Sequence, residues 1–371
     1  MKIEPFALER WQSEWENRAP FNLAESGVLP LSLEEVLDGG ELQAVGRLRL
    51  GYGHTNGTPA LRAAIAALYP GAQPDNVVAT VGAAEANYVA LWRLVEPGDE
   101  VVAILPNYMQ LPGLACGLGA TLVPLWLKAG TSWRLDAAEL RERVGPRTRA
   151  ICVCHPNNPT GATLSAEEMD AVVAAAAKHG SWVLADEVYR DAVREGDPTP
   201  SFWGRGERVV VVSGLSKAYG LPGLRLGWVL GPADLVADLW GRRDYTTISP
   251  AVVSDAVATV VLQPERRHKV LARTRSILRE NHVRLALWAA GQGENVSYVP
   301  PAAGAIAFVR YRWRVGSTAL AQRLLSEQGV LVVPGDQFGL DGYLRLGFGY
   351  GAPQLEAALH RMAAVFATLE A

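Results

Sequence analysis

The chain has 371 residues, of which 49% are hydrophobic and 20% are charged, and its formal net charge is -3 at pH 7. This length allows one large domain with a substantial core and a smaller second domain, and the composition is typical of a soluble globular protein. The small negative charge lacks the basic field that attracts nucleic acid or an anionic membrane. No run approaches the ~18 continuous apolar residues of a membrane span, and the first five residues show no secretory leader. We therefore expect a cytoplasmic single-chain enzyme or binding protein.

Three cysteines, Cys116, Cys152 and Cys154, are too few for a disulfide framework. Cys152 and Cys154 lie two apart in the apolar run 150–154, so both thiols are expected on one side of a strand. We interpret this pair as reduced core residues. The alternative is a metal or redox role, but no ligand residues are nearby in the sequence, and we predict no metal site.

Short apolar runs alternate with helical patterns from about residue 60 to residue 235. The predicted strands cover residues 77–80, 101–105, 121–125, 150–154, 181–185, 209–212 and 226–230. Residues 84–94 and 166–178 have helical spacing, and Ser165 with Glu168 forms a capping-box pattern before the second helix. This alternation predicts an α/β fold whose mostly parallel sheet is covered on both faces. Such sheets bind ligands at the carboxyl ends of their strands.

The second region begins with a helical pattern from residue 252 to residue 284, interrupted near Gln263 and Pro264. Strands are predicted near residues 306–310, 330–333 and 343–346, and a last helix over residues 353–369. These elements suggest a compact α+β domain, completed by part of the first 45 residues. The predicted organisation is a large α/β domain over residues 46–275 and a small domain made of residues 1–45 and 276–371.

The most informative segment covers residues 213–228 and follows the predicted strand 209–212. It contains four glycines and a proline, so it is not a continuous helix. Lysine is rarely buried without a partner, and packing alone explains Lys217 in this turn poorly. Near a second cation such as Arg225, a buried Lys217 would have a lowered pKa and could supply the neutral amine that a Schiff base requires. The alternative is a surface lysine in a loop.

Gly214-Leu215-Ser216-Lys217, with Arg225-Leu226-Gly227 after it, resembles the lysine motif of the class I and II aminotransferases. These enzymes have fold type I and use pyridoxal 5′-phosphate (PLP). The resemblance implies a large α/β domain with a small domain, and PLP held as a Schiff base on Lys217. Further motifs match in the same order from about residue 22 to the last helix.

By this resemblance, the Asn-Pro-Thr-Gly turn of residues 158–161 places Asn158 at the phenolic oxygen of the cofactor. An ordinary proline turn is the alternative for that segment. Asp186 would face the pyridine nitrogen and keep it protonated, and Tyr189 would hydrogen-bond the phenolic oxygen. Tyr108 would stack on the ring, although a core aromatic is the alternative. The residues implied for the phosphate are Gly82, Ala83, Ala84, Ser216 and Arg225.

The resemblance also concerns the substrate and a second subunit. Arg345 would bind the substrate α-carboxylate with two parallel hydrogen bonds, and Asn158 would assist it. Tyr52 would reach the cofactor phosphate of a partner subunit, which implies a homodimer. Gly27 corresponds to a turn that touches the substrate, but extra residues precede Pro30 here.

Positions 214 and 54 also depart from the family pattern. Position 214 is glycine where many relatives have a phosphate-binding serine, although Ser213 and Ser216 are close. Glu25 and His54 are candidates for recognition of a substrate side chain, and solvated positions are the alternative.

The resulting hypothesis is a transaminase acting on an amino acid and a 2-oxo acid. The alternative is a PLP-dependent lyase or cyclase acting on a modified basic amino acid, because residues 26–28, 215–223 and 243–247 resemble capreomycidine synthase and its relatives. Capreomycidine synthase cyclises a hydroxylated arginine by elimination and ring closure. A PLP-binding regulator is disfavoured because no DNA-binding extension is attached.

Overall fold

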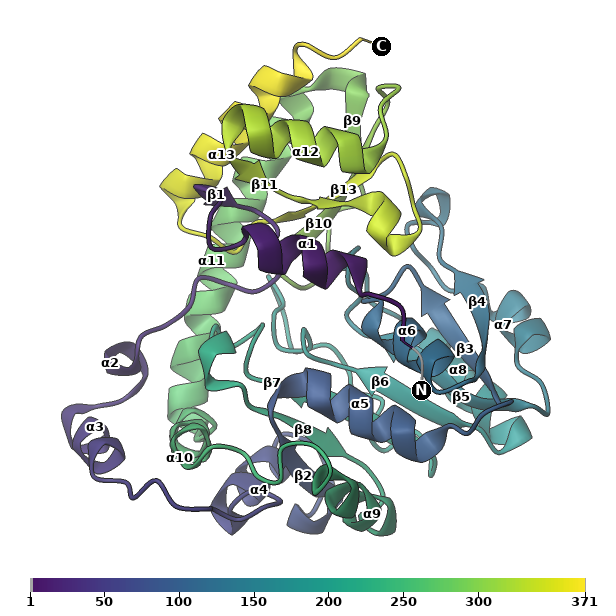
Figure 1. The fold of residues 1–371 in the computed structure, drawn as a ribbon, viewed down its shortest axis with the longest axis vertical. Helices are drawn as coiled ribbons and strands as arrows, with labels where there is room; N and C mark the ends of the chain where they lie inside the picture. Colours follow the sequence, from purple (N-terminus) through teal and green to yellow (C-terminus); the bar gives the residue numbers. More distant parts are fainter. Residues whose placement is uncertain (1–2, 371) are drawn as a thin grey trace.

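A large sheet and a smaller sheet lie one above the other in Figure 1, and the long helix α11 (Pro264–Gly291) runs from one to the other. The structure is a computed structural model, and it describes residues 3–370. The larger sheet consists of β2 (Val77–Thr80), β3 (Glu100–Leu105), β4 (Thr121–Trp126), β5 (Thr148–Cys154), β6 (Trp182–Asp186), β7 (Val209–Gly214) and β8 (Gly227–Leu230).

The strand order in this sheet is β2-β8-β7-β6-β5-β3-β4. The neighbours β4, β3, β5, β6 and β7 pair in parallel, whereas β8 is antiparallel to both β2 and β7. Each predicted strand of this region is therefore confirmed, and so is the mostly parallel sheet. Because β3, β5, β6 and β7 run in the same direction, the residues that follow them emerge at one edge.

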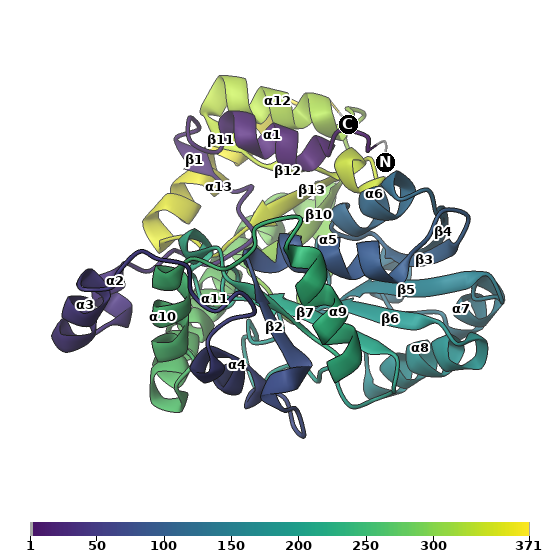
Figure 2. The ribbon, with the colours of Figure 1, turned by 60° about the horizontal axis from the view of Figure 1, so that its bottom comes forward.

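Helices cover both faces of the larger sheet, as Figure 2 shows. Alternation along β5 sends Ala150 and Cys152 into one hydrophobic cluster and Ile151 and Val153 into the other. The first cluster includes α5 (Gly82–Leu94), α6 (Gln110–Gly117) and α9 (Ala233–Arg243); the second includes α4 (Pro59–Ala66), α7 (Ala137–Arg143) and α8 (Ala166–His179). The predicted capping box of Ser165 and Glu168 begins α8.

The smaller part contains a four-stranded antiparallel sheet in the order β12-β13-β10-β9 and a two-stranded parallel pair, β1-β11. The strands are β1 (Phe21–Asn22), β9 (Val296–Tyr298), β10 (Ile306–Tyr311), β11 (Val330–Leu331), β12 (Val333–Pro334) and β13 (Tyr343–Gly347). The helices around them are α1 (Ala7–Trp15), α12 (Ser317–Gln328) and α13 (Ala352–Phe366), together with α11. In Figure 1, α1 lies where the two parts meet.

The single strand predicted over residues 330–333 is wrong, because this run is divided between two sheets. Leu331 pairs with Asn22 of β1, whereas Val333 pairs with Arg345 of β13. Between them, the carbonyl of Val332 accepts a hydrogen bond from Nε1 of Trp11 at 2.8 Å. The backbone therefore changes partners at Val332 without a glycine or proline to signal the change.

The remaining helices are short or link the two parts. They are α2 (Leu33–Val36), α3 (Gly39–Gly46) and α10 (Val252–Val261), and the 3-10 helices η1 (Pro74–Asn76), η2 (Ala129–Thr131), η3 (Pro222–Leu224), η4 (Gly293–Asn295) and η5 (Gly335–Phe338). The predicted interruption near Pro264 is confirmed, because α10 ends at Val261 and α11 begins at Pro264. Within residues 3–370, none of the helices combines the length and apolarity needed to cross a membrane.

Candidate active site

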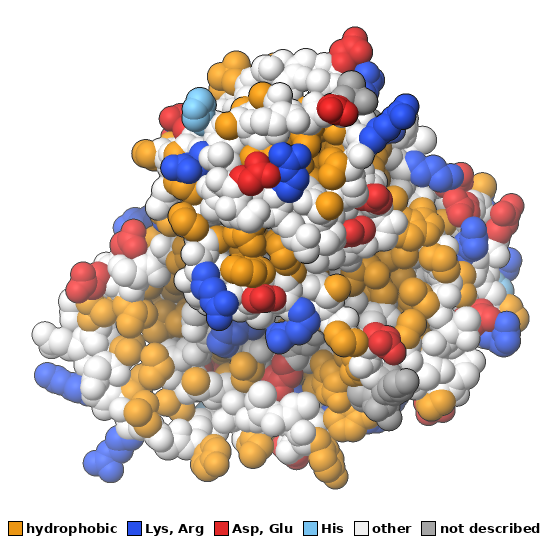
Figure 3. Space-filling model, turned by 45° about the horizontal axis from the view of Figure 1, so that its top comes forward, with side chains coloured by type: hydrophobic (Ala, Val, Ile, Leu, Met, Phe, Trp, Pro, Cys, Tyr) orange, Lys and Arg blue, Asp and Glu red, His pale blue; other side chains and the backbone are white. Residues whose placement is uncertain are grey.

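A cavity of about 350 Å³ lies at the carboxyl edge of the larger sheet, beneath β13 and α1. In Figure 3, acidic and basic side chains surround the hollow where the two parts meet. The predicted site residues that line the cavity are Ala83, Ala84, Tyr108, Asn158, Asp186, Tyr189, Ser216, Lys217, Arg225 and Arg345. The fold therefore brings together side chains that are up to about 260 positions apart in the sequence.

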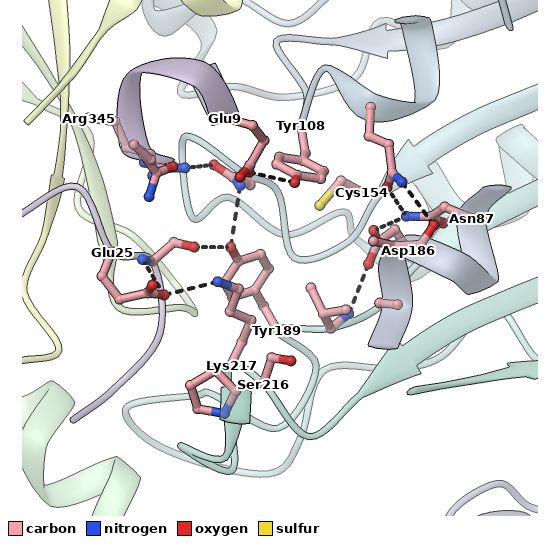
Figure 4. A pocket seen from close by; sticks show the side chains of 18 of the residues that line it. Glu9, Glu25, Asn87, Tyr108, Cys154, Asp186, Tyr189, Ser216, Lys217 and Arg345 are labelled. Atoms are coloured by element: carbon pink, nitrogen blue, oxygen red, sulfur yellow. Dashed lines mark hydrogen bonds and ion pairs between the residues drawn. The ribbon is translucent and has the colours of Figure 1, made fainter. Parts of the chain in front are cut away.

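Lys217 lies in the loop after β7, and its Nζ donates a hydrogen bond to Oε1 of Glu25 at 3.0 Å (Figure 4). Burial lowers the pKa of Lys217, but the negative charge of Glu25, the nearby Tyr189 and the hydrogen bond to Glu25 together more than offset this, so the pKa is raised overall. The same ion pair lowers the pKa of Glu25 to about 2. The sequence-based expectation of a lowered lysine pKa beside Arg225 is thus wrong for the free lysine, since a carboxylate is its immediate partner.

Asp186 ends β6, and its side chain is almost fully buried, with the residue 4% exposed. Its Oδ2 accepts a hydrogen bond from Nδ2 of Asn87 at 2.8 Å, and its Oδ1 accepts one from the N–H of Val188 at 3.2 Å. Burial raises the pKa of Asp186. A carboxylate in such surroundings requires a cationic or donating partner from the cavity. The sequence analysis missed Asn87, which reaches Asp186 from α5.

Asn158 follows β5 and makes contacts on both sides of its amide. Its Nδ2 donates to the hydroxyl of Tyr189 at 3.3 Å, and that hydroxyl donates to Oγ of Ser26 at 2.9 Å. Burial raises the pKa of Tyr189, so its hydroxyl stays protonated. Figure 4 shows Tyr189 beside Lys217 in the cavity. These side chains therefore form a hydrogen-bonded wall next to Lys217.

Arg345 projects from β13 and is 1% exposed. Its Nη1 donates to Oδ1 of Asn158 at 3.1 Å, and its Nη2 donates to the carbonyl of Ala24 and, at 3.4 Å, to Oε1 of Gln12. Among residues 3–370, its Nε has no hydrogen-bond partner, and no carboxylate is hydrogen-bonded to the guanidinium. Burial lowers the pKa of Arg345. A buried guanidinium without a carboxylate is suited to bind an anionic group of a ligand.

The opposite end of the cavity is formed by the start of α5 and by Arg225. Gly82 begins the helix with a φ of +77°, and the side chain of Val81 at the N-cap makes no capping hydrogen bond. A Cβ on Gly82 would lie 2.5 Å from Nη2 of Arg225, so the glycine allows the guanidinium to approach the helix terminus. Nη1 of Arg225 also lies 3.4 Å from Oγ of Ser216. A positive helix terminus beside an arginine and a serine can hold a phosphate group.

The N-terminal helix contributes residues that the sequence analysis did not identify. Oε1 of Glu9 accepts a hydrogen bond from the hydroxyl of Tyr108 at 2.7 Å, and Glu9, Gln12 and Glu16 all line the cavity. The helical spacing of Leu8, Trp11 and Trp15 could have predicted α1, but not the direction in which its polar face points.

Cys154 also lines the cavity, although the sequence analysis interpreted it as core alone. Its thiol is buried, and burial together with Asp186 raises its pKa well above the usual range. Cys152, in contrast, packs within the hydrophobic core as expected.

Three of the proposed residues do not line this cavity. Gly82 lies behind Arg225, and Gly27 lines an adjoining hollow, where its Cβ would lie 3.2 Å from the carbonyl oxygen of Ser216. Tyr52 is 87% exposed and lies outside the cavity, so its proposed contact with a partner's cofactor stays a prediction. His54 is also exposed, whereas Glu25 lines the cavity.

The residues of the cavity fit PLP. Asp186 offers a buried carboxylate for the ring nitrogen, Arg225 and the start of α5 suit the phosphate, and Lys217 has the primary amine that bonds the aldehyde. Asn87 lines the cavity, and its Oδ1 has no hydrogen-bond partner within the described part of the chain, which also indicates a site built for a ligand. Within the described residues, no group of His, Cys, Asp and Glu side chains is arranged to hold a metal ion.

Comparison with known proteins gives the same picture over nearly the whole chain. The family description "Aminotransferase class I and II" matches residues 21–362. Capreomycidine synthase of Streptomyces vinaceus is 36% identical over 364 residues, which cover 95% of this chain and 91% of that protein. Arginine–pyruvate transaminase of Pseudomonas aeruginosa is 31% identical over 305 residues, with coverage of 80% and 76%. The crystal structure of a PLP-dependent aminotransferase from Streptococcus suis 89-1591 is 33% identical, with a TM-score of 0.94 and full coverage of both chains.

Proposed function

Because the chain belongs to the class I and II aminotransferases, a PLP-dependent family of fold type I, we propose that it transfers an amino group between an amino acid and a 2-oxo acid. The observation that carries this proposal is the meeting of Lys217, Asp186 and Arg345 in one cavity. These side chains supply an amine, a buried carboxylate and a buried guanidinium, which suit the cofactor aldehyde, the ring nitrogen and a substrate carboxylate.

The chain's own residues bind and orient the reacting groups. When bound, PLP supplies an aldehyde and an electron-poor ring that stabilises negative charge at the substrate Cα. Asp186 keeps the ring nitrogen protonated, and its own orientation is fixed by Asn87. Arg225, Ser216 and the start of α5 hold the phosphate. Tyr108 covers one side of the cavity, held by Glu9.

Lys217 is the proton carrier in this proposal. With PLP bound, the amine of Lys217 would take up the Cα proton of the substrate and hold it close to the reacting carbon. Arg345 holds the α-carboxylate, and Asn158 fixes the guanidinium through the 3.1 Å hydrogen bond. Asn158, Tyr189 and Ser26 form a hydrogen-bonded wall next to the Lys217 amine, and these bonds hold the side chain of Asn158 in place.

A second candidate is a lyase or cyclase of the capreomycidine synthase type. The 36% identity to capreomycidine synthase over 95% of the chain supports it. So does Glu25, because its carboxylate lies 3.0 Å from Nζ of Lys217 and can accept a proton beside the reacting amine. Elimination of a substituent from Cβ adds a second proton transfer to the one at Cα. Both candidate reactions begin with the removal of the Cα proton of the substrate.

We also propose that the protein acts as a homodimer. Leu50, Tyr52 and Tyr245 are exposed by 82%, 87% and 83%. A hydrogen bond of 2.8 Å from Nε1 of Trp240 to Oγ1 of Thr55 joins the segments that carry them. Apolar surface of this kind is typical of an interface between subunits. Light scattering of the purified protein tests this, and a monomer at micromolar concentration would contradict it.

The experiment that separates the two candidates uses one amino acid without a 2-oxo acid. A transaminase releases a single equivalent of 2-oxo acid per active site and then stops, with the cofactor left in its aminated form. A lyase or cyclase continues to turn over under the same conditions. The cofactor absorbance and the amount of 2-oxo acid formed are followed together. If no amino acid in a broad panel changes the absorbance, both candidates fail.

A further inference from the structure

If the cavity residues take the roles proposed above, negative charge is left in excess around the cavity. Four carboxylates and three cations line it, namely Glu9, Glu16, Glu25 and Asp186, and Lys217, Arg225 and Arg345. In the proposed function, Asp186 faces the ring nitrogen, Arg225 the phosphate and Arg345 the substrate carboxylate. Lys217 loses its role as an ion-pair partner when its nitrogen bonds the cofactor. Three glutamates of the N-terminal segment then remain without a cationic partner.

Of these glutamates, Glu9 has a fixed neighbour, because it accepts the hydrogen bond of Tyr108. The charge of Glu16 is affected more by Glu25 than by Glu9. Burial raises the pKa of Glu16, and the negative charges of Glu25 and Glu9 raise it further. Burial likewise raises the pKa of Tyr350 to about 12, again with contributions from Glu25 and Glu16. Glu16, Glu25 and Tyr350 all line one space next to the cavity.

This space is a second hollow of about 250 Å³ that adjoins the cavity. The cavity and the hollow share Glu16, Glu25 and Pro222 in their walls. Asn17, Asn22 and Tyr350 line the far side of the hollow with amide and hydroxyl groups. A ligand whose α-carboxylate is bound by Arg345 can thus extend past Lys217 and between the two glutamates. The unpartnered Nε of Arg345, on a residue that is 1% exposed, independently indicates an anionic ligand at the start of this path.

We propose that Glu16 and Glu25 bind the cationic end of a long substrate side chain, a guanidinium or an ammonium group, at the junction of the cavity and the hollow. This inference rests on the proposed function and adds the class of amino acid. A guanidinium presents several N–H donors that match two carboxylates, and each charge-assisted hydrogen bond is stronger than a neutral one. An acidic side chain would be repelled by the same pair.

The test measures how strongly the holoenzyme prefers a charged side chain over a neutral one of the same shape. L-arginine is compared with L-citrulline, whose urea group replaces the guanidinium, and L-ornithine is compared with L-norleucine, whose terminal methyl replaces the ammonium group. L-alanine and L-glutamate complete the panel. The half-saturating concentration for the change in cofactor absorbance is measured for each amino acid. We expect arginine or ornithine to saturate the enzyme at a concentration roughly tenfold or more below that of its neutral counterpart.

Variants locate the origin of this preference. Glu16→Gln is expected to reduce the preference by roughly tenfold and to leave the neutral amino acids almost unaffected. Glu25→Gln should also reduce the preference, and because Glu25 contacts Lys217, the cofactor absorbance of this variant shows whether Lys217 still bonds the cofactor. Glu14→Gln is the matched control, because Glu14 lies near the end of the same helix, is exposed and is absent from both walls. It should keep the full preference.

The outcomes separate this inference from the proposed function. If alanine and citrulline act as well as arginine and ornithine, the proposed function stands and the cationic site is wrong. The same holds if glutamate is preferred, or if both Glu16→Gln and Glu25→Gln keep the preference. If no amino acid changes the cofactor absorbance, the proposed function itself fails, and the inference fails with it.

Discussion

Oδ1 of Asn158 accepts a hydrogen bond from Nη1 of Arg345 at 3.1 Å, and this contact joins the two parts of the chain inside the cavity. Asn158 follows β5 of the larger sheet, whereas Arg345 belongs to β13 of the smaller one. The direction of the guanidinium therefore depends on the position of the smaller part relative to the larger sheet. The position of a substrate carboxylate bound by Arg345 would therefore depend on both parts of the chain.

Arg345→Ala should weaken substrate binding and leave the cofactor in place. Loss of a charge-assisted pair costs about 2–3 kcal/mol, so the KM for an amino acid should rise by roughly a hundredfold. Arg345→Lys should give a smaller rise, because the ammonium keeps the charge but not the two parallel donors. Arg310→Ala, an exposed arginine on the neighbouring strand β10, is the control. Loss of the cofactor absorbance in Arg345→Ala would show that this arginine was assigned the wrong ligand.

Lys217→Ala should prevent covalent attachment of the cofactor. The readout is the mass of the protein after borohydride reduction, which should show the added cofactor in the native protein but not in the variant. Turnover should fall by roughly a thousandfold or more, because the same amine carries the proton. Lys178→Ala, in the last turn of α8, removes an exposed lysine and should change neither result. A cofactor adduct in Lys217→Ala would place the bond on another residue.

The sequence predicted the elements that depend on local pattern. Apolar runs located the strands of the larger sheet, since a strand covered on both faces must be apolar on both. The residues directly after those strands, such as Asn158, Lys217 and Asp186 at the last position of β6, were predicted to share a site because parallel strands end at one edge. The structure brings them into one cavity.

Contacts between distant segments could not be predicted in this way. Glu25 reaches Lys217 across 192 positions, and Asn87 reaches Asp186 across 99. Nothing in the local spacing of Glu25 shows which cation it will meet, so the direction of the lysine pKa was predicted wrongly. The division at Val332 also depends on distant segments. Leu331 before it pairs with Asn22, and Val333 after it pairs with Arg345.

The ion pair between Glu25 and Lys217 should make the stability of the cofactor-free protein depend on pH. Lys217 lowers the pKa of Glu25 from its ordinary value of 4.5 to about 2. A carboxylate with a lower pKa in the folded state stabilises that state above its unfolded pKa, and this contribution is lost as the pH falls from about 4.5 to about 2. After allowance for partial exposure, it amounts to roughly 2 kcal/mol.

Urea unfolding at two pH values measures this contribution. Glu25→Gln should lower the free energy of unfolding by roughly 2 kcal/mol near neutral pH and by clearly less at about pH 3. Glu14→Gln should behave like the native protein at both values, since Glu14 is exposed. An equal loss at both pH values would mean that Glu25 contributes through packing rather than through its charge.

Gly82→Ala should weaken cofactor binding through Arg225. The substitution has two costs: a left-handed backbone at φ +77°, and a Cβ that would lie 2.5 Å from Nη2 of the guanidinium. Gly71 has nearly the same backbone, with φ +78°, but a Cβ there meets nothing within 4 Å. Gly71→Ala therefore reproduces the backbone strain of about 1 kcal/mol without displacing an arginine.

Both alanine variants should lose similar stability in urea unfolding, but only Gly82→Ala should release the cofactor more readily. We expect its dissociation constant for PLP to rise by roughly tenfold or more, because Arg225 must move away from the start of α5. The measurement is equilibrium dialysis followed by cofactor absorbance. If both variants retain the cofactor equally, the guanidinium at this helix terminus does not hold the phosphate, and the orientation of PLP proposed for the cavity is wrong.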